Sequence, residues 1–294
     1  MQGDLSENHH TQLESLLNRI SHDPYLFSIS DYTQSAWIGH APFLKFLIRE
    51  LRPKTFVELG VHNGFSYFVG CQAIKECGIE ANAFAIDHWA GDEHAGIFDD
   101  STFQAVTKLN QQYLHFSTLL RMSFSQASSR FELNSIDLLH IDGFHSYESI
   151  KEDFETWISR VSTNGIVLLH DIHVRRNTFG VYRYWEEIRS QYKTIEFVGA
   201  HGLGVIFLGE IPLGDLQVLF NYAQEGSLGR IQGTFGSISD DVIQGFRYRS
   251  IEACVEERDR VIEERDRVLN STTWKIFGPY RKFIQSLLAL ARQS

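Results

Sequence analysis

The segment LLHIDGFHSYE, residues 139–149, places Asp142, His145 and Glu148 directly behind a run of residues suited to a buried strand. Charge inside a sheet is costly, so acids at a strand end usually need a cation, a proton or a hydrogen-bond network to compensate them. Glu148 fits the first turn of a following helix, where an acid suits the helix dipole. Asp142 and His145 are therefore the stronger candidates for chemistry.

A second acid lies at the end of another strand-like run, GIVLLHD, residues 165–171, where Asp171 follows His170. With Asp142, these residues form a predicted metal site. Magnesium is the simplest cation, because it takes a few carboxylate oxygens and keeps waters that a substrate can replace. The imidazole of His170 suits manganese, iron or zinc better, which leaves the metal open. Alternatively, His170 points into the core from an alternating strand and binds nothing, with His173 as another nitrogen donor nearby.

A third feature is the stretch ELGVHNG, Glu58 to Gly64. Gly60 and Gly64 allow a tight turn and a close approach of the backbone to a ligand, and the following helix offers free N–H groups. Asp87 ends the next predicted strand, where a carboxylate can accept the ribose hydroxyls of a nucleoside cofactor. The plain alternatives are an ordinary strand-to-helix turn and a turn-forming Asp.

Helical and strand-like segments alternate from about residue 40 to 210, which predicts a layered α/β domain. We expect a Rossmann-like, doubly wound, mostly parallel sheet of seven strands. The last two strands, TIEFV and GVIFL, are separated by the short turn GAHGLG, so the last strand should run antiparallel. In open α/β sheets, ligands bind outside the carboxyl ends of the strands, so the strand-terminal acids should converge.

Together, TFVELGVHNGFSY, the strand-ending Asp87, HIDGFHSYE and LLHD resemble class I S-adenosylmethionine-dependent methyltransferases over roughly residues 36–210. A nicotinamide-binding enzyme is the competing reading, but ELGVHNG lacks the GxGxxG phosphate cradle. The resemblance implies that the first loop frames the methionine end, Asp87 holds the ribose and Ser123 borders the adenine. The predicted cofactor contacts are Glu58, Gly60, Asn63, Gly64, Ser66, Asp87, His88, Ser123 and Asp142.

The second half of the pattern resembles the metal-dependent sugar O-methyltransferases of macrolide biosynthesis, the macrocin-type group, and the related cephalosporin hydroxylase-like proteins. In that group an acid follows the fourth strand, a His three residues later serves as base, and two adjacent acids end the fifth strand. Asp142, His145 and Asp171 match, whereas His170 departs from the pattern. The resemblance implies that a metal at Asp142 and Asp171 acidifies a substrate hydroxyl and that His145 removes the proton. Alternatively, His145 is a loop residue bonded to backbone.

The segments that flank the α/β domain have helical patterns. Residues 1–35 are predicted to form an N-terminal helical segment. On the carboxyl side, residues 211–250 are predicted to form an accessory or cap region with Gly-rich breaks, and residues 251–294 a charged helix with a basic-aromatic tail. The repeat VEERDRVIEERDRV gives a heptad seam suited to a short coiled coil or homo-oligomer, or simply a solvated helix. The tail suits an anionic membrane surface or a glycan-assembly partner, since similar tails occur on bacterial glycan-assembly proteins.

Composition narrows the function classes. The chain has 294 residues and a formal net charge of −10, which disfavours a sequence-independent nucleic-acid binder. Its amino terminus lacks the features of a signal peptide, no run approaches a membrane span, and three cysteines favour a reducing, cytoplasmic setting. We expect an O-methyltransferase acting on a glycan or glycosylated metabolite. The alternative is a hydroxylase-like or catalytically silent cofactor-binding module that acts through its helical tail.

Overall fold

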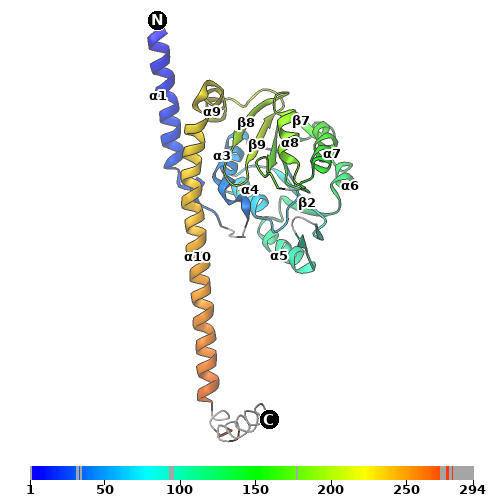
Figure 1. Cartoon of the computed structure of the whole chain (residues 1–294), viewed down its shortest axis with the longest axis vertical. Helices are drawn as coiled ribbons and strands as arrows, with labels where there is room; N and C mark the ends of the chain where they lie inside the picture. The colour runs from blue at the N-terminus through cyan, green and yellow to red at the C-terminus, as the bar shows by residue number, and fades with distance from the viewer. Residues whose placement is uncertain are drawn as a thin grey trace. The chain divides into compact units, whose positions relative to one another are not determined.

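The computed structural model describes residues 2–30, 33, 35–92, 96–176, 178–271, 276, 277 and 280. The chain divides into two compact units, residues 1–243 and 244–294. The first unit contains the sheet and both layers of helices around it (Figure 1). The predicted domain boundaries at residues 36, 211 and 251 stay predictions.

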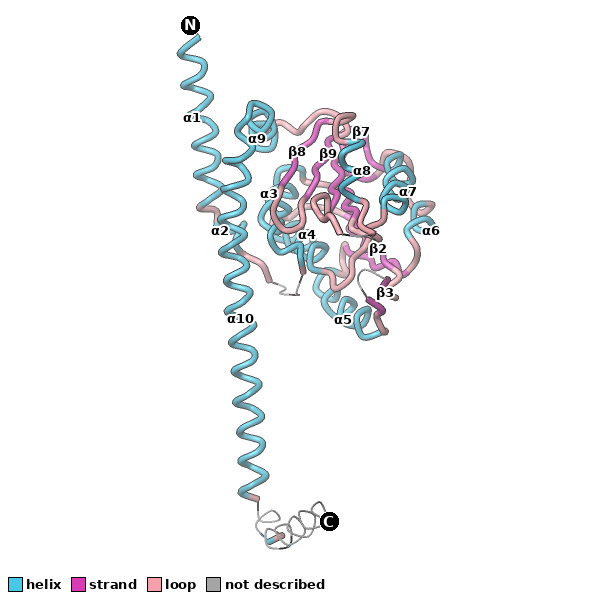
Figure 2. Tube along the Cα trace, viewed as in Figure 1, coloured by secondary structure: helices cyan, strands magenta, loops and turns pink. Residues whose placement is uncertain are grey.

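Seven strands form the main sheet in the order β5-β2-β1-β6-β7-β9-β8. Figure 2 shows the strands in magenta, with helices around them. Neighbouring strands are parallel except where β9 pairs with β7 and β8. This confirms the predicted Rossmann-like sheet with its antiparallel last strand. The strands are β1 Thr55–Leu59, β2 Asn82–Asp87, β5 Ser117–Arg121, β6 Ile136–Ile141, β7 Val161–His170, β8 Lys193–Phe197 and β9 Leu203–Phe207. Two short strands, β3 Gly91–Asp92 and β4 Gly96–Ile97, pair antiparallel in a separate two-stranded sheet.

Helices connect the strands and extend the chain at both ends. The α-helices are α1 Gln2–Ser21, α2 Pro24–Phe27, α3 Ala41–Leu51, α4 Phe65–Glu76, α5 Asp100–Asn110, α6 Phe124–Ser128, α7 Tyr147–Trp157, α8 Val181–Ile188, α9 Asp215–Tyr222 and α10 Leu228–Asn270. The short 3-10 turns are η1 Ala36–His40, η2 Gln111–Tyr113 and η3 Ile158–Arg160, and η4 Ala223–Ser227 is a π turn.

The strands bury both faces, as expected for a parallel sheet covered on two sides. One face packs against α6, α7 and α8 through a core that includes Val57, Leu139, Val167, Trp157 and Trp185. On the other face, Phe56 of β1 lies 5.7 Å from Tyr67 of α4, centroid to centroid. Since side chains alternate along a strand, Glu58, His140 and His170 fall on this second face. This alternation places three polar side chains on one face of the sheet, near the carboxyl ends of β1, β6 and β7.

Residues 228–243, the amino-terminal part of α10, belong to the first unit. Phe235 packs edge-on against Phe43 of α3, with centroids 5.5 Å apart, and the Ser239 hydroxyl bonds to the Gly39 carbonyl. We predicted Gly-rich breaks in this region, but the structure shows one break only, at Gly226 with φ 93°. Gly229, Gly233 and Gly236 lie inside the continuous helix, because tertiary packing outweighs their weak helix propensity.

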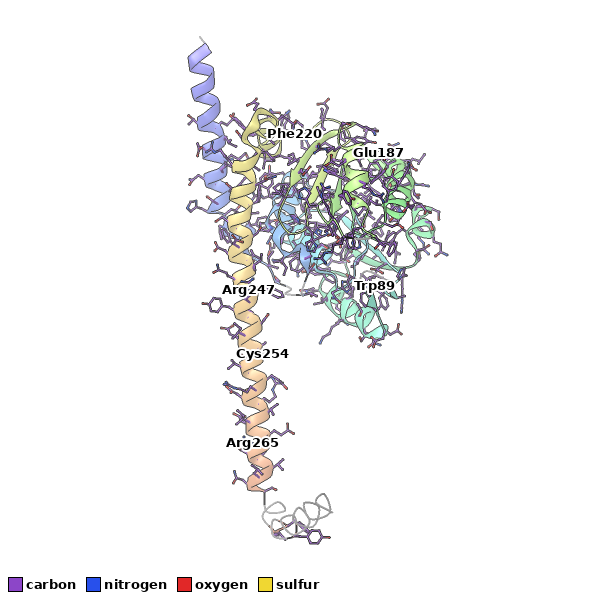
Figure 3. All side chains as sticks on the ribbon, viewed as in Figure 1. Trp89, Glu187, Phe220, Arg247, Cys254 and Arg265 are labelled. Carbon is purple, nitrogen blue, oxygen red and sulfur yellow. The ribbon has the colours of Figure 1, made fainter. Side chains whose placement is uncertain are left out.

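The second unit contains the rest of α10, residues 244–270, whose side chains are exposed from Arg247 onward. Cys254 and Arg265 project from this helix in Figure 3. Intrahelical ion pairs such as Arg260 with Glu257, 2.6 Å apart, support a solvated helix. The predicted heptad partner stays a prediction, and nearly all of the basic-aromatic tail lies outside the described residues. Among the helices described, none is long and apolar enough to cross a bilayer.

Candidate active site

A cavity of about 890 Å³ lies at the carboxyl ends of β1, β2, β6 and β7. It brings together nearly all of the residues predicted to act. Its walls include the predicted residues Gly60, Asn63, Ser66, Asp87, His88, Ser123, Asp142, His145, His170 and Asp171. Glu58 and Gly64 are not among the lining residues. The predicted convergence of strand ends is therefore present in the fold.

Gly60 follows β1 with φ 84°, a conformation that favours glycine. A Cβ atom added there would lie 2.0 Å from the carbonyl oxygen of Asp142, so the loop after β1 touches the loop after β6 directly. The Asp142 amide also donates to the Leu59 carbonyl at 2.8 Å. Gly64, with φ 88°, caps the start of α4 instead of facing the cavity. The two glycines therefore have different roles in one turn.

Asp87 ends β2 and organises the same turn. One carboxylate oxygen accepts the amides of Val61 and His62, each at 2.9 Å, and the other accepts the Trp89 amide at 2.7 Å. A carboxylate offers about four acceptor positions, so roughly one remains for a ligand. Accepting both ribose hydroxyls would require one of these backbone bonds to open.

Glu58 lies fully buried beneath the cavity. Its carboxylate accepts the Ser66 hydroxyl at 2.7 Å and lies 2.9 Å from Nδ1 of His140. Nε2 of His140 accepts the indole N–H of Trp37 at 3.0 Å, which leaves the imidazole proton on Nδ1, facing Glu58. Burial raises the pKa of Glu58, while His140 and Ser66 oppose that shift. In this structure Glu58 lies beneath the cavity and orients the Ser66 hydroxyl through their hydrogen bond.

Ser123 and His88, two further predicted cofactor residues, also line the cavity. Ser123 begins α6 with a capping box, in which its hydroxyl accepts the Gln126 amide at 3.3 Å. Nδ1 of His88 accepts the amide of Ala90, which fixes the turn after β2. Local hydrogen bonds thus hold both side chains in their positions in the cavity lining.

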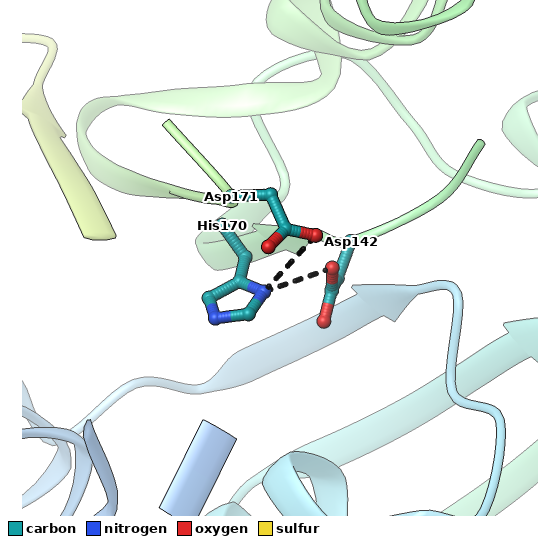
Figure 4. Close-up of side chains that lie close together, drawn as sticks. All are labelled: Asp142, His170 and Asp171. Atoms are coloured by element: carbon teal, nitrogen blue, oxygen red, sulfur yellow. Dashed lines mark hydrogen bonds and ion pairs between the residues drawn. The ribbon is translucent and has the colours of Figure 1, made fainter. Parts of the chain in front are cut away.

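Asp142, His170 and Asp171 form the candidate metal centre (Figure 4). Each offers one ligand atom, and these atoms all lie within 4.8 Å of one another. Nδ1 of His170 lies 3.2 Å from Oδ1 of Asp142 and 3.7 Å from Oδ2 of Asp171. Burial raises the pKa of Asp142, but the imidazoles of His170 and His145 outweigh it and hold that pKa well below its usual range. Asp142 is therefore ionised, as a metal ligand must be.

The orientation of His170 fits a metal ligand. Its Nε2 lies 3.0 Å from the carbonyl oxygen of Ala200, so this nitrogen carries a proton. The other nitrogen, Nδ1, is the one that faces the two carboxylates. Metal-binding imidazoles usually donate their second N–H in this way, which fixes the tautomer. His170 is buried, as one alternative anticipated, but it is not directed away from the acids. His173 is bonded instead to Glu196, at 2.6 Å.

His145 lies beside the same acids. Its Nε2 is 2.8 Å from Oδ2 of Asp171 and 3.7 Å from Oδ1 of Asp142. Burial lowers the pKa of His145, but the two carboxylates outweigh burial and raise it to about 10. Without another cation nearby, His145 is thus protonated at neutral pH. A cation shared by Asp142 and Asp171 would oppose that shift, because it neutralises their charge.

Sequence reasoning missed the contribution of the turn between β8 and β9. The Ala200 carbonyl accepts from both His170 and His40, and Nδ1 of His201 lies 3.0 Å from Oδ1 of Asp171. Burial lowers the pKa of His40 to about 3, so it is neutral. The only sequence signal is a His within the Gly-rich segment GAHGLG, a pattern that by itself predicts no more than a turn.

The fold and the cavity at the strand ends match the arrangement that the resemblance to class I methyltransferases predicts. Residues 57–172 match the family model described as "Methyltransferase domain", and this part of the chain is a methyltransferase domain. The matched segment runs from β1 to just beyond Asp171 and so includes the strand-end acids described above.

A relative in Sinorhizobium fredii, "Uncharacterized protein y4gI", is 44% identical over 195 residues. The match covers 66% of this chain and 21% of that protein, so the chain spans about a fifth of the length of the relative. The similarity places the domain within a longer protein in that organism.

Similar solved structures include the O-methyltransferase TomG from Streptomyces achromogenes, at 15% identity and a TM-score of 0.46, covering 66% of this chain and 90% of that one. A putative caffeoyl-CoA O-methyltransferase from Staphylococcus aureus is similar at 16% identity and a TM-score of 0.46, covering 70% and 98%. Likeness at this level identifies no substrate for this chain.

Proposed function

We propose that the chain transfers a methyl group from S-adenosylmethionine to a hydroxyl oxygen, with a divalent cation assisting. The observation that carries the proposal is the meeting of Asp142, His145 and Asp171 in one cavity with the Gly60 turn and Asp87. Methyl transfer to a hydroxyl requires a methyl donor, a group that acidifies the hydroxyl and a base that takes its proton. The cofactor region, the acids and the neighbouring imidazole would supply these three.

On the cofactor side, the Gly60 turn and Asp87 would hold the nucleoside and the methionine end, with Ser123 at the rim. S-adenosylmethionine, when bound, supplies an electrophilic methyl group. The close approach at Gly60 keeps the cofactor turn fixed against Asp142. This contact would set the alignment of acceptor and methyl group, on which methyl transfer depends.

On the acceptor side, Asp142, Asp171 and Nδ1 of His170 would hold the cation. A bound divalent cation lowers the pKa of a coordinated hydroxyl. His145, 2.8 Å from Asp171, is placed to take the hydroxyl proton once it is neutral. One imidazole among the ligands favours manganese, iron or zinc over magnesium.

For the acceptor we propose a sugar hydroxyl in a glycan, glycolipid or glycosylated metabolite. The support is the match of Asp142, His145 and Asp171 to the macrocin-type sugar O-methyltransferases and the likeness of the carboxyl-terminal tail to tails of glycan-assembly proteins. Two neighbouring sugar oxygens would suit a cation held by two carboxylates.

The test is calorimetric titration of the whole chain with S-adenosylmethionine, with and without manganese or magnesium. We expect saturable cofactor binding in either condition. Silence in both would end the methyltransferase proposal. A mass-spectrometric search for the gain of one methyl group on candidate glycans would then identify the acceptor. Methyl transfer that continues unchanged after chelation of divalent ions would exclude a role for the metal.

A further inference from the structure

The turn between β8 and β9, residues 198–202, reaches the candidate metal centre from outside the cofactor-binding strands. Because β8 runs parallel to β7 and β9 returns antiparallel, this turn lies at the same sheet edge as the end of β7. His201, in the turn, lines the cavity. Its side chain is 46% exposed, whereas that of Asp171 is 7% exposed.

His201 and His145 hold Asp171 from two sides. Nδ1 of His201 lies 3.0 Å from Oδ1 of Asp171, and Nε2 of His145 lies 2.8 Å from Oδ2. An ionised carboxylate only accepts, so His201 donates from Nδ1. Asp171 itself follows β7 with φ 61°, at a point where the chain leaves the sheet. Its carboxylate therefore depends on neighbouring donors for a fixed direction.

The turn that carries His201 is itself tightly held. Ala200 and His201 have φ 48° and 72°, which ordinary side chains rarely adopt. The His173 amide donates to the His201 carbonyl at 2.9 Å. A Cβ atom on Gly39 would lie 2.7 Å from that of Ala200, and one on Gly202 would lie 2.8 Å from the His173 ring. The backbone of the turn is thus fixed by contacts on two sides.

We propose that His201 is a positioning residue, which orients Asp171 for a divalent cation at Asp142, His170 and Asp171. This inference rests on the metal site of the proposed function. The same turn orients a second ligand, since the Ala200 carbonyl fixes the tautomer of His170. Two of the three ligands are then set by one turn, and residues that hold a ligand in this way contribute to metal affinity.

The experiment measures manganese affinity of the full-length protein by titration calorimetry and by the loss of the free-ion electron paramagnetic resonance signal. His201→Ala should weaken manganese binding roughly 10- to 100-fold. His201→Asn should restore most of it, because the Asn amide nitrogen can occupy the position of Nδ1 and Asn tolerates a positive φ. His115→Asn is the matched control, since His115 is exposed, lies outside the cavity lining and should leave manganese affinity unchanged.

Thermal unfolding of each variant separates loss of fold from loss of metal affinity. If His201→Ala binds manganese like the wild type, the positioning role is wrong while the metal site stands. If His201→Asn binds manganese as weakly as His201→Ala, a hydrogen-bond donor at this position is not sufficient and the imidazole has another role. The positioning role is then excluded as well. A wild-type protein that binds no manganese would overturn the metal site and this inference together.

Discussion

His145 lies flat against Phe179, with ring centroids 4.7 Å apart and ring planes 10° apart. Phe179 comes from the segment between β7 and α8, so the candidate base is oriented by a side chain that lies outside the strand ends. The Phe179 amide in turn donates to the Arg176 carbonyl at 2.8 Å. One side of the imidazole is thereby covered, and its edge is directed to Asp171.

Replacing Phe179 should lower turnover without changing the affinity for the cofactor. A stacked pair of this kind contributes about 1 kcal/mol beyond its buried area, so Phe179→Ala should lower kcat roughly three- to tenfold. Steady-state rates and a cofactor titration measure the two effects. Phe179→Tyr, which keeps the ring, should stay close to the wild type. Equal losses in both variants would show that stacking is not what orients His145.

The metal ligands give a second prediction. Asp142→Asn and Asp171→Asn should each lower metal-dependent turnover by at least about 100-fold, since a bound cation contributes several kcal/mol to stabilisation of developing charge. Cofactor affinity, measured by calorimetry, should remain largely intact. Asp240→Asn, at an exposed position of α10, is the control for a change of net charge. Activity that survived in both variants would show that the metal role is wrongly assigned.

Gly60 should tolerate no side chain. Gly60→Ala would place a Cβ atom 2.0 Å from the Asp142 carbonyl oxygen and should cost roughly 3 kcal/mol or more of unfolding free energy. Gly78→Ala is the matched control, because Gly78 also has a positive φ but has no atom within 4 Å of the added Cβ. That change should cost about 1 kcal/mol. Urea denaturation compares them, and equal costs would contradict a steric role for the Asp142 carbonyl.

Asp153 predicts a pH dependence of stability. It lies on α7 at the cavity wall, where burial and the nearby Glu152 raise its pKa to about 7. Between the unfolded pKa, near about 4, and about 7, the folded state binds more protons than the unfolded state, so this group lowers stability as pH rises. Asp153→Asn should therefore stabilise the protein at pH 8, on the order of 1 kcal/mol, and change little at pH 4.

Thermal or urea unfolding of wild type and Asp153→Asn across this pH range makes the comparison. Glu155→Gln, an exposed position on the same helix, removes a charge of the same sign without burial. A stability difference that is constant from pH 4 to pH 8 would show that the Asp153 carboxyl keeps an ordinary pKa.

Periodicity was enough to predict the sheet, because buried parallel strands such as TFVEL and IDLLHI are mostly apolar and are followed by Gly or an acid. The acids converge because parallel strands share a carboxyl edge, so Asp87, Asp142 and Asp171 could be placed from the strand positions alone. What could not be predicted is the direction of a side chain within that edge. Glu58 shares the pattern, yet strand alternation places it below the cavity.

The contributions of Trp37, His40 and His201 also lay beyond sequence reasoning. Trp37 and His140 are 103 residues apart, and His40 and Ala200 are 160 residues apart, so only tertiary packing brings them together. The Gly-rich stretch of α10 shows the converse error, since local propensity predicted breaks that packing of Phe235 and Ile238 overrides.

The Asp142 amide bonds to the Leu59 carbonyl and Gly60 is pressed against the Asp142 carbonyl, so the turn after β1 is in direct contact with the loop that carries Asp142. A cofactor that displaces the turn after β1 must therefore also displace Asp142. Thermodynamic reciprocity then fixes the size of the effect in both directions: the factor by which cofactor alters cation affinity equals the factor by which cation alters cofactor affinity.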